Sequence, residues 1–168
     1  GGLIMLRRLV FITLAAAVTL AFAASPAGAD KISNAFRGKI LFSVDPLPPP
    51  DAENAKATIK SYKSLALKTL GSSEADGVAT WQFYFTAFMK KKPKTSSLTL
   101  EFYTADKEKL FVADKRLNGA DPNMQILSSP VTISEDENLN RNRKYNVKLV
   151  AKVKGKDVTL ATGAIATK

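Results

Sequence analysis

Alternation of apolar and polar residues is the main pattern of the chain, and it predicts β-strands. From residue 79 to 89 the odd positions are apolar and the even positions are mixed, so one face suits a core. Residues 98–103 and 145–153 alternate in the same way, as is typical of antiparallel sheets with one solvated face. Weaker alternation predicts strands at residues 39–44, 109–113, 125–128, 130–134 and 158–167.

One segment has helical spacing instead. After three consecutive prolines, apolar residues recur at intervals of three and four, which predicts a single helix over about residues 51–64. Asp51 is suited to cap its start, and lysines fall toward its outer face and its end. Residues 65–70 fit either a continuation of this helix or a separate strand.

The corner before the strand at 145–153 carries the most specific structural motif. Leu139 precedes Tyr145 by six residues, and alternation begins at that tyrosine. This arrangement resembles the tyrosine corner of fibronectin type III and other immunoglobulin-like domains. The resemblance implies a mostly β fold, an antiparallel immunoglobulin/fibronectin-III-like β-sandwich of about seven to eight strands, with the short helix as an addition. It also implies a bond from the hydroxyl of Tyr145 to the backbone of the preceding loop. The alternative is an ordinary hairpin with a buried tyrosine.

The N-terminal residues have the features of a secretory signal peptide. Arg7 and Arg8 precede an uncharged apolar run, and the small residues Ala27 and Ala29 follow it. We therefore expect residues 1–29, with residues 1–4 upstream of a start at Met5, to be removed by cleavage after Ala29. Residues 30–168 would then form a single domain in the periplasm or outside the cell, without a transmembrane anchor. An uncleaved membrane anchor is the alternative interpretation.

Composition narrows the chemistry. The chain has 25 Lys and Arg against 15 Asp and Glu, and it has neither Cys nor His. Disulfides, thiolate chemistry, imidazole metal sites and histidine-activated nucleophiles are therefore excluded. The expected mature part has 139 residues and a net charge of +8, because residues 1–29 contain two arginines and no acid.

Acidic residues offer few alternatives for catalysis or metal binding. Most of them cluster in predicted turns, where carboxylates are usually solvated, so we expect no enzyme activity and no cofactor. Residues 136–140 place oxygen-bearing side chains as the opening of a calcium loop does, but Arg141 and Val147 stand where that loop needs Gly and Glu. A polar turn is one interpretation of this segment, and a weak calcium site built with Glu135 is the other.

A run of lysines is the main candidate for a binding site. Lys90, Lys91, Lys92 and Lys94 lie between the two clearest strands, which predicts that they form the tip of a hairpin. Four cations there would attract a polymer that carries negative charge, with an affinity that falls as salt rises. The alternative is that these lysines keep the protein soluble and protect a strand edge.

Aromatic residues do not turn this run into a site that reads nucleic acid. Trp81, Phe83 and Phe85 fall on the apolar face of their strand, and only Tyr84, Phe88 and Tyr103 are expected outside the core, too few to stack successive bases. The sequence thus favours a non-catalytic binding or assembly module. The alternatives are an accessory subunit of an envelope complex that engages partners through a sheet edge, and a carboxylate-dependent enzyme.

Overall fold

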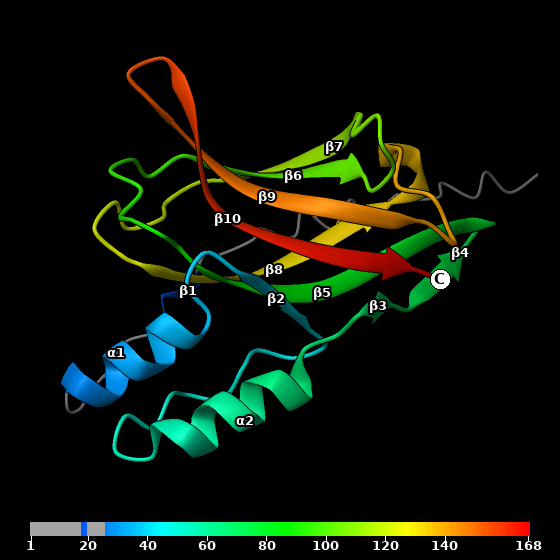
Figure 1. The fold of residues 1–168 in the computed structure, drawn as a ribbon. Helices are drawn as coiled ribbons and strands as arrows, with labels where there is room; N and C mark the ends of the chain where they lie inside the picture. The colour runs from blue at the N-terminus through cyan, green and yellow to red at the C-terminus, as the bar shows by residue number, and fades with distance from the viewer. Residues whose placement is uncertain (1–17, 20–25) are drawn as a thin grey trace, which may run out of the picture.

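The computed structural model describes residues 18–19 and 26–168 (Figure 1). The elements are β1 (Val18–Thr19), α1 (Pro26–Ala35), β2 (Ile40–Ser43), α2 (Ala55–Leu65), β3 (Thr69–Leu70), β4 (Ser72–Ala75), β5 (Val78–Phe88), β6 (Leu98–Thr104), β7 (Phe111–Leu117), β8 (Ile126–Ser134), the 3₁₀ helix η1 (Glu135–Glu137), β9 (Lys144–Val153) and β10 (Lys156–Thr167). The prediction of a mostly β fold built from antiparallel sheets is confirmed.

The strands form two sheets. The first sheet has the order β1-β8-β5-β2, and β4 forms a hairpin with the start of β5. The second sheet has the order β3-β10-β9-β6-β7 and is strongly curled. All neighbours are antiparallel except β3, which runs parallel to the end of β10.

The main core lies between the two sheets and confirms the predicted strand faces. Trp81, Phe83 and Phe85 of β5 are at most 2% exposed, and they belong to one cluster with inward-facing residues of β6 and β9. The indole N–H of Trp81 donates to the carbonyl of Lys168 at 3.0 Å. A buried donor without a partner would cost free energy, so this bond makes a fully buried tryptophan compatible with the core.

The corner at Tyr145 has the geometry that the motif predicts. Its ring is 2% exposed, and its hydroxyl oxygen accepts a hydrogen bond from the backbone N–H of Asn140 at 2.8 Å. The hydroxyl of Thr167, at the end of β10, donates to the carbonyl of Asn140 at 2.6 Å. The loop that connects β8 to β9 is therefore held from both sides.

The predicted helix exists but begins later than expected. Asn54 caps α2 at 3.4 Å, whereas the carboxylate of Asp51 accepts from the backbone N–H groups of Glu53 and Asn54 in a preceding turn. The helix ends at Leu65 because Ala66 adopts an extended conformation. Residues 66–68 are irregular and residues 69–70 form β3, so a strand forms only at the end of the segment 65–70, for which the sequence left helix and strand open.

Helices α1 and α2 lie side by side on the outer side of the first sheet and form a second, smaller core (Figure 1). Phe36, which follows α1, packs with Tyr62 of α2 and Phe88 of β5, with ring centroids 5.0–6.4 Å apart. The expectation that Phe88 lies outside the core is wrong, because these helices cover it and leave it 1% exposed. Burial raises the pKa of Tyr62 to about 12, and its hydroxyl donates to the carbonyl of Pro48.

Helix α1 overlaps the predicted end of the signal peptide. Most of residues 1–29 lie outside the described residues, but residues 26–29 form the first turn of α1, whose first residue is Pro26. Gly28 packs so closely on α2's entry that a Cβ there would lie 1.7 Å from the carbonyl oxygen of Ala52. Within the described residues, neither helix has the length and apolar character needed to cross a membrane.

Two strand predictions need correction. The strand expected at 109–113 occupies Phe111–Leu117, because residues 106–109 form a turn in which the carboxylate of Asp106 accepts two backbone N–H groups. The strands expected at 125–128 and 130–134 are one strand, β8, in which Pro130 lies opposite Tyr84. Proline is tolerated there because, within the described residues, β8 pairs on its other side with β1 alone, at two positions.

The lysine run does not lie at the tip of a hairpin. Strand β5 belongs to the first sheet and β6 to the second, so residues 89–97 cross from one sheet to the other. This connection is longer than the usual hairpin loop of two to five residues, and both strands find other partners. The predicted hairpin is therefore wrong.

Candidate anion-binding site

The crossover that carries the lysines is held to the fold by its backbone. Lys90 donates its N–H to the carbonyl of Leu160 at 2.9 Å, and Lys94 donates to that of Pro122 at 2.9 Å. Between them, Pro93 is buried, whereas Lys90, Lys91, Lys92 and Lys94 are exposed. The structure thus anchors the main chain and leaves the four predicted side chains in solvent.

Two further cations join the run from a distant part of the sequence. The pairing of β2 with the end of β5 brings Gly38 beside Phe88, with an N–H···O bond of 2.6 Å. Arg37 and Lys39, both exposed, flank that glycine. The guanidinium of Arg37 donates to the carbonyl of Lys90 at 3.0 Å, which fixes it next to the crossover. We call Arg37, Lys39, Lys90, Lys91, Lys92 and Lys94 the basic end.

The side chain of Lys90 lies against Gly38. A Cβ on Gly38 would lie 2.8 Å from Cε of Lys90, so the aliphatic stem of the lysine covers this glycine. Gly38 also has a φ of +75°, a conformation that glycine adopts without strain. The same glycine therefore allows both the backbone turn between α1 and β2 and the close approach of the lysine.

Within the described part of the chain, no ion pair neutralises the positive charge of the basic end. Among the residues that the structure describes, all salt bridges are made by Arg141 and Lys115. No acidic residue occurs in the sequence between Asp76 and Glu101 or between Asp30 and Asp45. The nearest loop contributes Asp121, whose carboxylate accepts the backbone N–H of Asn123 at 2.9 Å. Six exposed cations therefore act on solvent and on whatever approaches this end.

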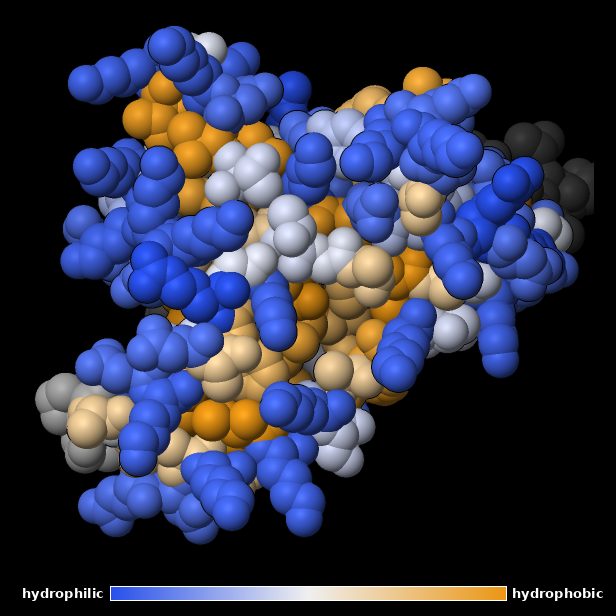
Figure 2. All heavy atoms as spheres, viewed as in Figure 1, coloured by the Kyte–Doolittle hydropathy of each residue, from blue (hydrophilic) through white to orange (hydrophobic). Residues whose placement is uncertain are grey.

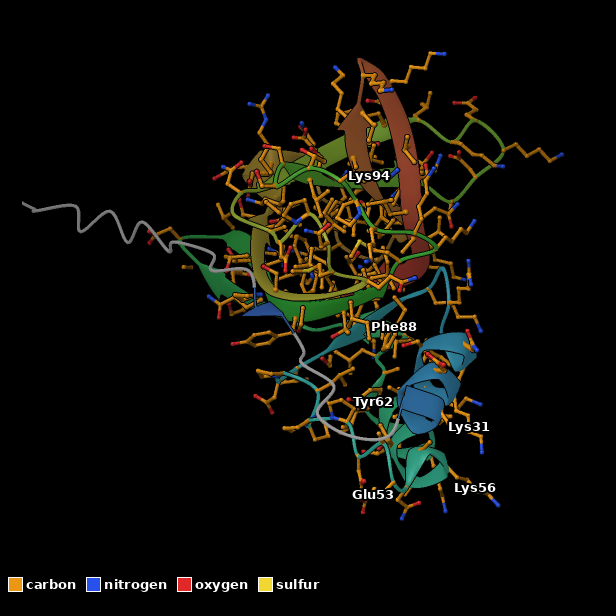
Figure 3. The ribbon with its side chains drawn as sticks, turned by 90° about the vertical axis from the view of Figure 1, so that its left-hand side faces the viewer. Lys31, Glu53, Lys56, Tyr62, Phe88 and Lys94 are labelled. Carbon is orange, nitrogen blue, oxygen red and sulfur yellow. The ribbon has the colours of Figure 1, made fainter. Side chains whose placement is uncertain are left out.

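The figures place this end within the whole molecule. Figure 2 shows hydrophilic side chains crowded along the left-hand edge, over the crossover and the β9–β10 hairpin. Figure 3, which views the molecule from that side, shows Lys94 on the sheets and Phe88 with Tyr62 at the boundary with the helices. Lys31 and Lys56 lie on the outer side of the helices, so they form a group separate from the basic end.

The acidic loop that offered a calcium site is occupied by arginine. The guanidinium of Arg141 donates to both carboxylate oxygens of Glu135, at 2.9 and 3.2 Å, and to Glu74 at 2.9 Å. Glu135 also accepts the backbone N–H of Ala79 at 2.8 Å. These bonds, first of all that from Arg141, lower the pKa of Glu135. Within the described part of the chain, no group of three or more acids is placed to hold a metal ion.

The chain matches no model of a known protein family, and no curated protein matches it. Sequence reasoning identified the four lysines but missed Arg37 and Lys39, which lie about fifty residues earlier. The predicted strand at 39–44 was the available signal, because a strand there has to pair with some part of the sheet, although the sequence does not give its register.

Proposed function

We propose that the protein is an exported, non-catalytic binding module that holds an anionic polymer at its basic end. The observation that carries this proposal is the set of six exposed cations, anchored by backbone hydrogen bonds and not neutralised by ion pairs among the described residues. Lysine ammonium groups on flexible stems suit a chain of repeated negative charges better than one shaped small anion. Binding would release counterions from the polymer and would therefore weaken steeply with salt.

Salt titration with a simple polyanion tests this proposal. The probe is inorganic polyphosphate, and the dissociation constant of the mature protein is measured from 50 to 300 mM salt. The proposal expects a straight line on logarithmic axes and a shallower slope after Lys90, Lys91, Lys92 and Lys94 are changed to Gln. Absence of salt-sensitive binding at physiological ionic strength would favour the solubilising role of the lysines instead.

Export is part of the proposal, with removal of residues 1–29 before the protein acts. Cleavage after Ala29 would leave residues 30–35 of α1, including the buried Ile32. Phe36, which follows them, would still pack against Tyr62 and Phe88. The second core would therefore survive processing. Intact mass of the exported protein tests this step: a species that retains Arg7 and Arg8 would contradict it.

An immunoglobulin-like sandwich is the architecture we propose for the module. Strands β6, β9 and β10 lie side by side as strands C, F and G do in such domains, and β5 and β8 lie side by side as B and E do. The tyrosine of the corner stands at the start of the penultimate strand, as in that family. The helix pair is an addition to the plan, inserted around β2.

A sheet edge supports a second candidate function, that of an accessory subunit. Strand β8 pairs with β1, with Val18 opposite Ser128 and Thr19 opposite Leu127. Those two residues belong to the predicted signal peptide, so its removal would open the edge of β8 to a strand from another protein. Purification of the mature protein from the envelope tests this function. A partner in constant stoichiometry would support it, and recovery of the mature protein alone would contradict it.

A further inference from the structure

A groove crosses the outer face of the second sheet, away from the core. Its volume is about 510 Å³, and it is lined by the side chains or backbone of Tyr103, Lys109, Asn146, Lys148, Thr162 and Ala164, with Val147 and Gly163 between them. Register explains why these residues meet: Tyr103 lies opposite Asn146, which lies opposite Ala164 on the next strand. The groove thus runs across β6, β9 and β10.

One side of the groove is apolar and aromatic. The ring of Phe111 meets that of Tyr103 edge to face, with centroids 5.8 Å apart, although Phe111 itself is 56% exposed. Leu110, beside it, is 54% exposed. The hydroxyl of Tyr103 donates to the carboxylate of Glu101, a bond that holds the ring against the sheet. Exposed aromatic surface of this kind, fixed in place, is typical of a surface used for binding.

The rest of the groove carries groups that bond to hydroxyls and carboxylates. Asn146 and Thr162 offer an amide and a hydroxyl, and Lys109 and Lys148 offer ammonium groups. The ammonium of Lys148 lies 4.7 Å from the centroid of the Tyr103 ring, so in the free protein it covers the ring by a cation–π contact. A negative group in the groove would draw this flexible side chain away and free the ring.

The groove adjoins the basic end. Residue Lys39 forms a parallel bridge with Thr162, and the N–H of Thr162 donates to the carbonyl of Gly38 at 2.9 Å. A polymer that lies on the basic end can therefore continue into the groove. This continuity links the two sites on one path over the surface.

From these observations, and resting on the proposed function, we infer that the anionic polymer is an acidic polysaccharide and that one of its sugar rings occupies the groove. A pyranose ring has a face of C–H groups, which suits the ring of Tyr103, and a rim of hydroxyls, which suits Asn146 and Thr162. Its carboxylate would pair with Lys109 and Lys148. Tyr103 and Phe111 meet edge to face at a single place, so they do not form the row of parallel faces that successive nucleic-acid bases require.

Replacement of Tyr103 tests this inference with two probes that share charge but differ in sugar content. Dissociation constants for polygalacturonate and for inorganic polyphosphate are measured at 150 mM salt. Tyr103→Ala is expected to weaken the binding of polygalacturonate about tenfold and that of polyphosphate less than twofold, because only the sugar stacks on the ring. Tyr103→Phe, which keeps the ring, should retain most of the affinity.

Two further variants guard against a change in folding. Tyr84→Ala removes a partly exposed tyrosine from the first sheet and should leave both affinities unchanged. Ala164→Leu adds bulk at an exposed position of the groove without removing any contact, and it should weaken polygalacturonate alone. Equal losses for the two polymers in Tyr103→Ala, or a matching tenfold loss for single-stranded DNA, would overturn the assignment to a saccharide.

A short saccharide separates this inference from the proposed function. Trigalacturonate is added to ¹⁵N-labelled protein, and the amide signals of Asn146, Thr162 and Gly163 are followed. Shifts at these amides, lost in Tyr103→Ala, would support the groove even if polyphosphate did not bind to the basic end. Salt-sensitive binding of polyphosphate without such shifts would leave the proposed function in place and overturn the saccharide site.

Discussion

The two ends of β5 differ in whether their charged side chains form ion pairs. At its start, near Val78, Arg141 is bonded to Glu74, Glu135 and the carbonyl of Gly77, so these opposite charges are paired within the fold. We call this region the matched end. At its far end, beyond Phe88, the basic end presents six cations that make no ion pair within the described part of the chain. Charges at the first end are paired within the fold, whereas those of the basic end are exposed to solvent.

The two ends also differ in the hydrogen bonds that hold them. The corner at the matched end uses side chains, since Tyr145 and Thr167 both bond to the main chain of Asn140. The basic end is held mainly by main-chain bonds of residues 38, 90 and 94, and Arg37 adds a side-chain bond to the carbonyl of Lys90, whereas its four lysines of residues 90–94 are exposed. Changes to side chains should therefore affect stability at the first end and binding at the second.

The largest effect is expected at Tyr145. Tyr145→Ala should lower the free energy of unfolding by about 3 kcal/mol or more, because a fully packed aromatic ring is lost. Tyr145→Phe should cost about 1 kcal/mol, the usual loss from one buried hydrogen bond. Urea unfolding measures both values. A phenylalanine variant as stable as the wild type would show that the hydroxyl does not stabilise the corner.

Gly38→Ala should have a smaller effect, about 1–2 kcal/mol, because alanine is strained at a φ of +75°. Its Cβ would also displace the stem of Lys90. Gly71→Ala is the matched control, since nothing lies within 4 Å of a Cβ there. If both variants unfolded at the same urea concentration as the wild type, the backbone of the basic end would not be as constrained as we describe.

Acid should lower the stability of the fold at the matched end because Glu135 becomes protonated. Its pKa is lowered in the folded state by Arg141, so its contribution to stability is complete above the ordinary value of 4.5 and is lost as pH falls through the folded pKa. Glu135→Gln should flatten the loss of thermal stability below pH 4.5. Asp106, whose pKa is lowered chiefly by Thr104, would account for part of what remains.

The control for this pH dependence is Glu53→Gln, at an exposed position on the entry to α2. Melting temperatures from pH 2.5 to 7 should fall in parallel for this variant and for the wild type. A Glu135→Gln profile that also ran parallel to the wild type would mean that the pair with Arg141 adds nothing to folding.

The smallest change in stability per substituted residue is expected at the basic end. Changing Lys90, Lys91, Lys92 and Lys94 to Gln should alter the free energy of unfolding by less than about 0.5 kcal/mol per site, because these side chains are exposed. Urea unfolding of the quadruple variant measures the sum. A larger loss would mean that the lysines stabilise the crossover, which would remove the contrast between the two ends.

Sequence patterns predicted the parts of this fold that depend on local order. The alternation in β5 and β9 is strong because each strand buries one complete face, and the corner at Tyr145 is a local motif. Strands β3 and β4 are too short to leave a pattern, and β4 is exposed throughout. Helix α1 was hidden because its first turn coincides with the small residues expected before a cleavage site.

The candidate site was only partly predictable because it depends on pairing between distant segments. Four of its cations are consecutive or nearly so in the sequence, whereas Arg37 and Lys39 reach them through the register of Ile40 with Ala87. The groove at Tyr103 likewise needs three strands in register. Alternation predicts which face a residue occupies, but it does not predict which strand lies beside it.

The most direct test of the contrast compares two variants of equal charge. One carries Gln at Lys90, Lys91, Lys92 and Lys94 of the basic end, and the other carries Gln at Lys31, Lys56, Lys60 and Lys63 of the helix pair, all exposed. The measurement is the slope of log affinity for polyphosphate against log salt. We predict that the basic-end variant loses about 3–4 units of slope and the helix variant less than about 1. Equal losses in the two variants would contradict the account, because they would show that net charge, and not the basic end, determines binding.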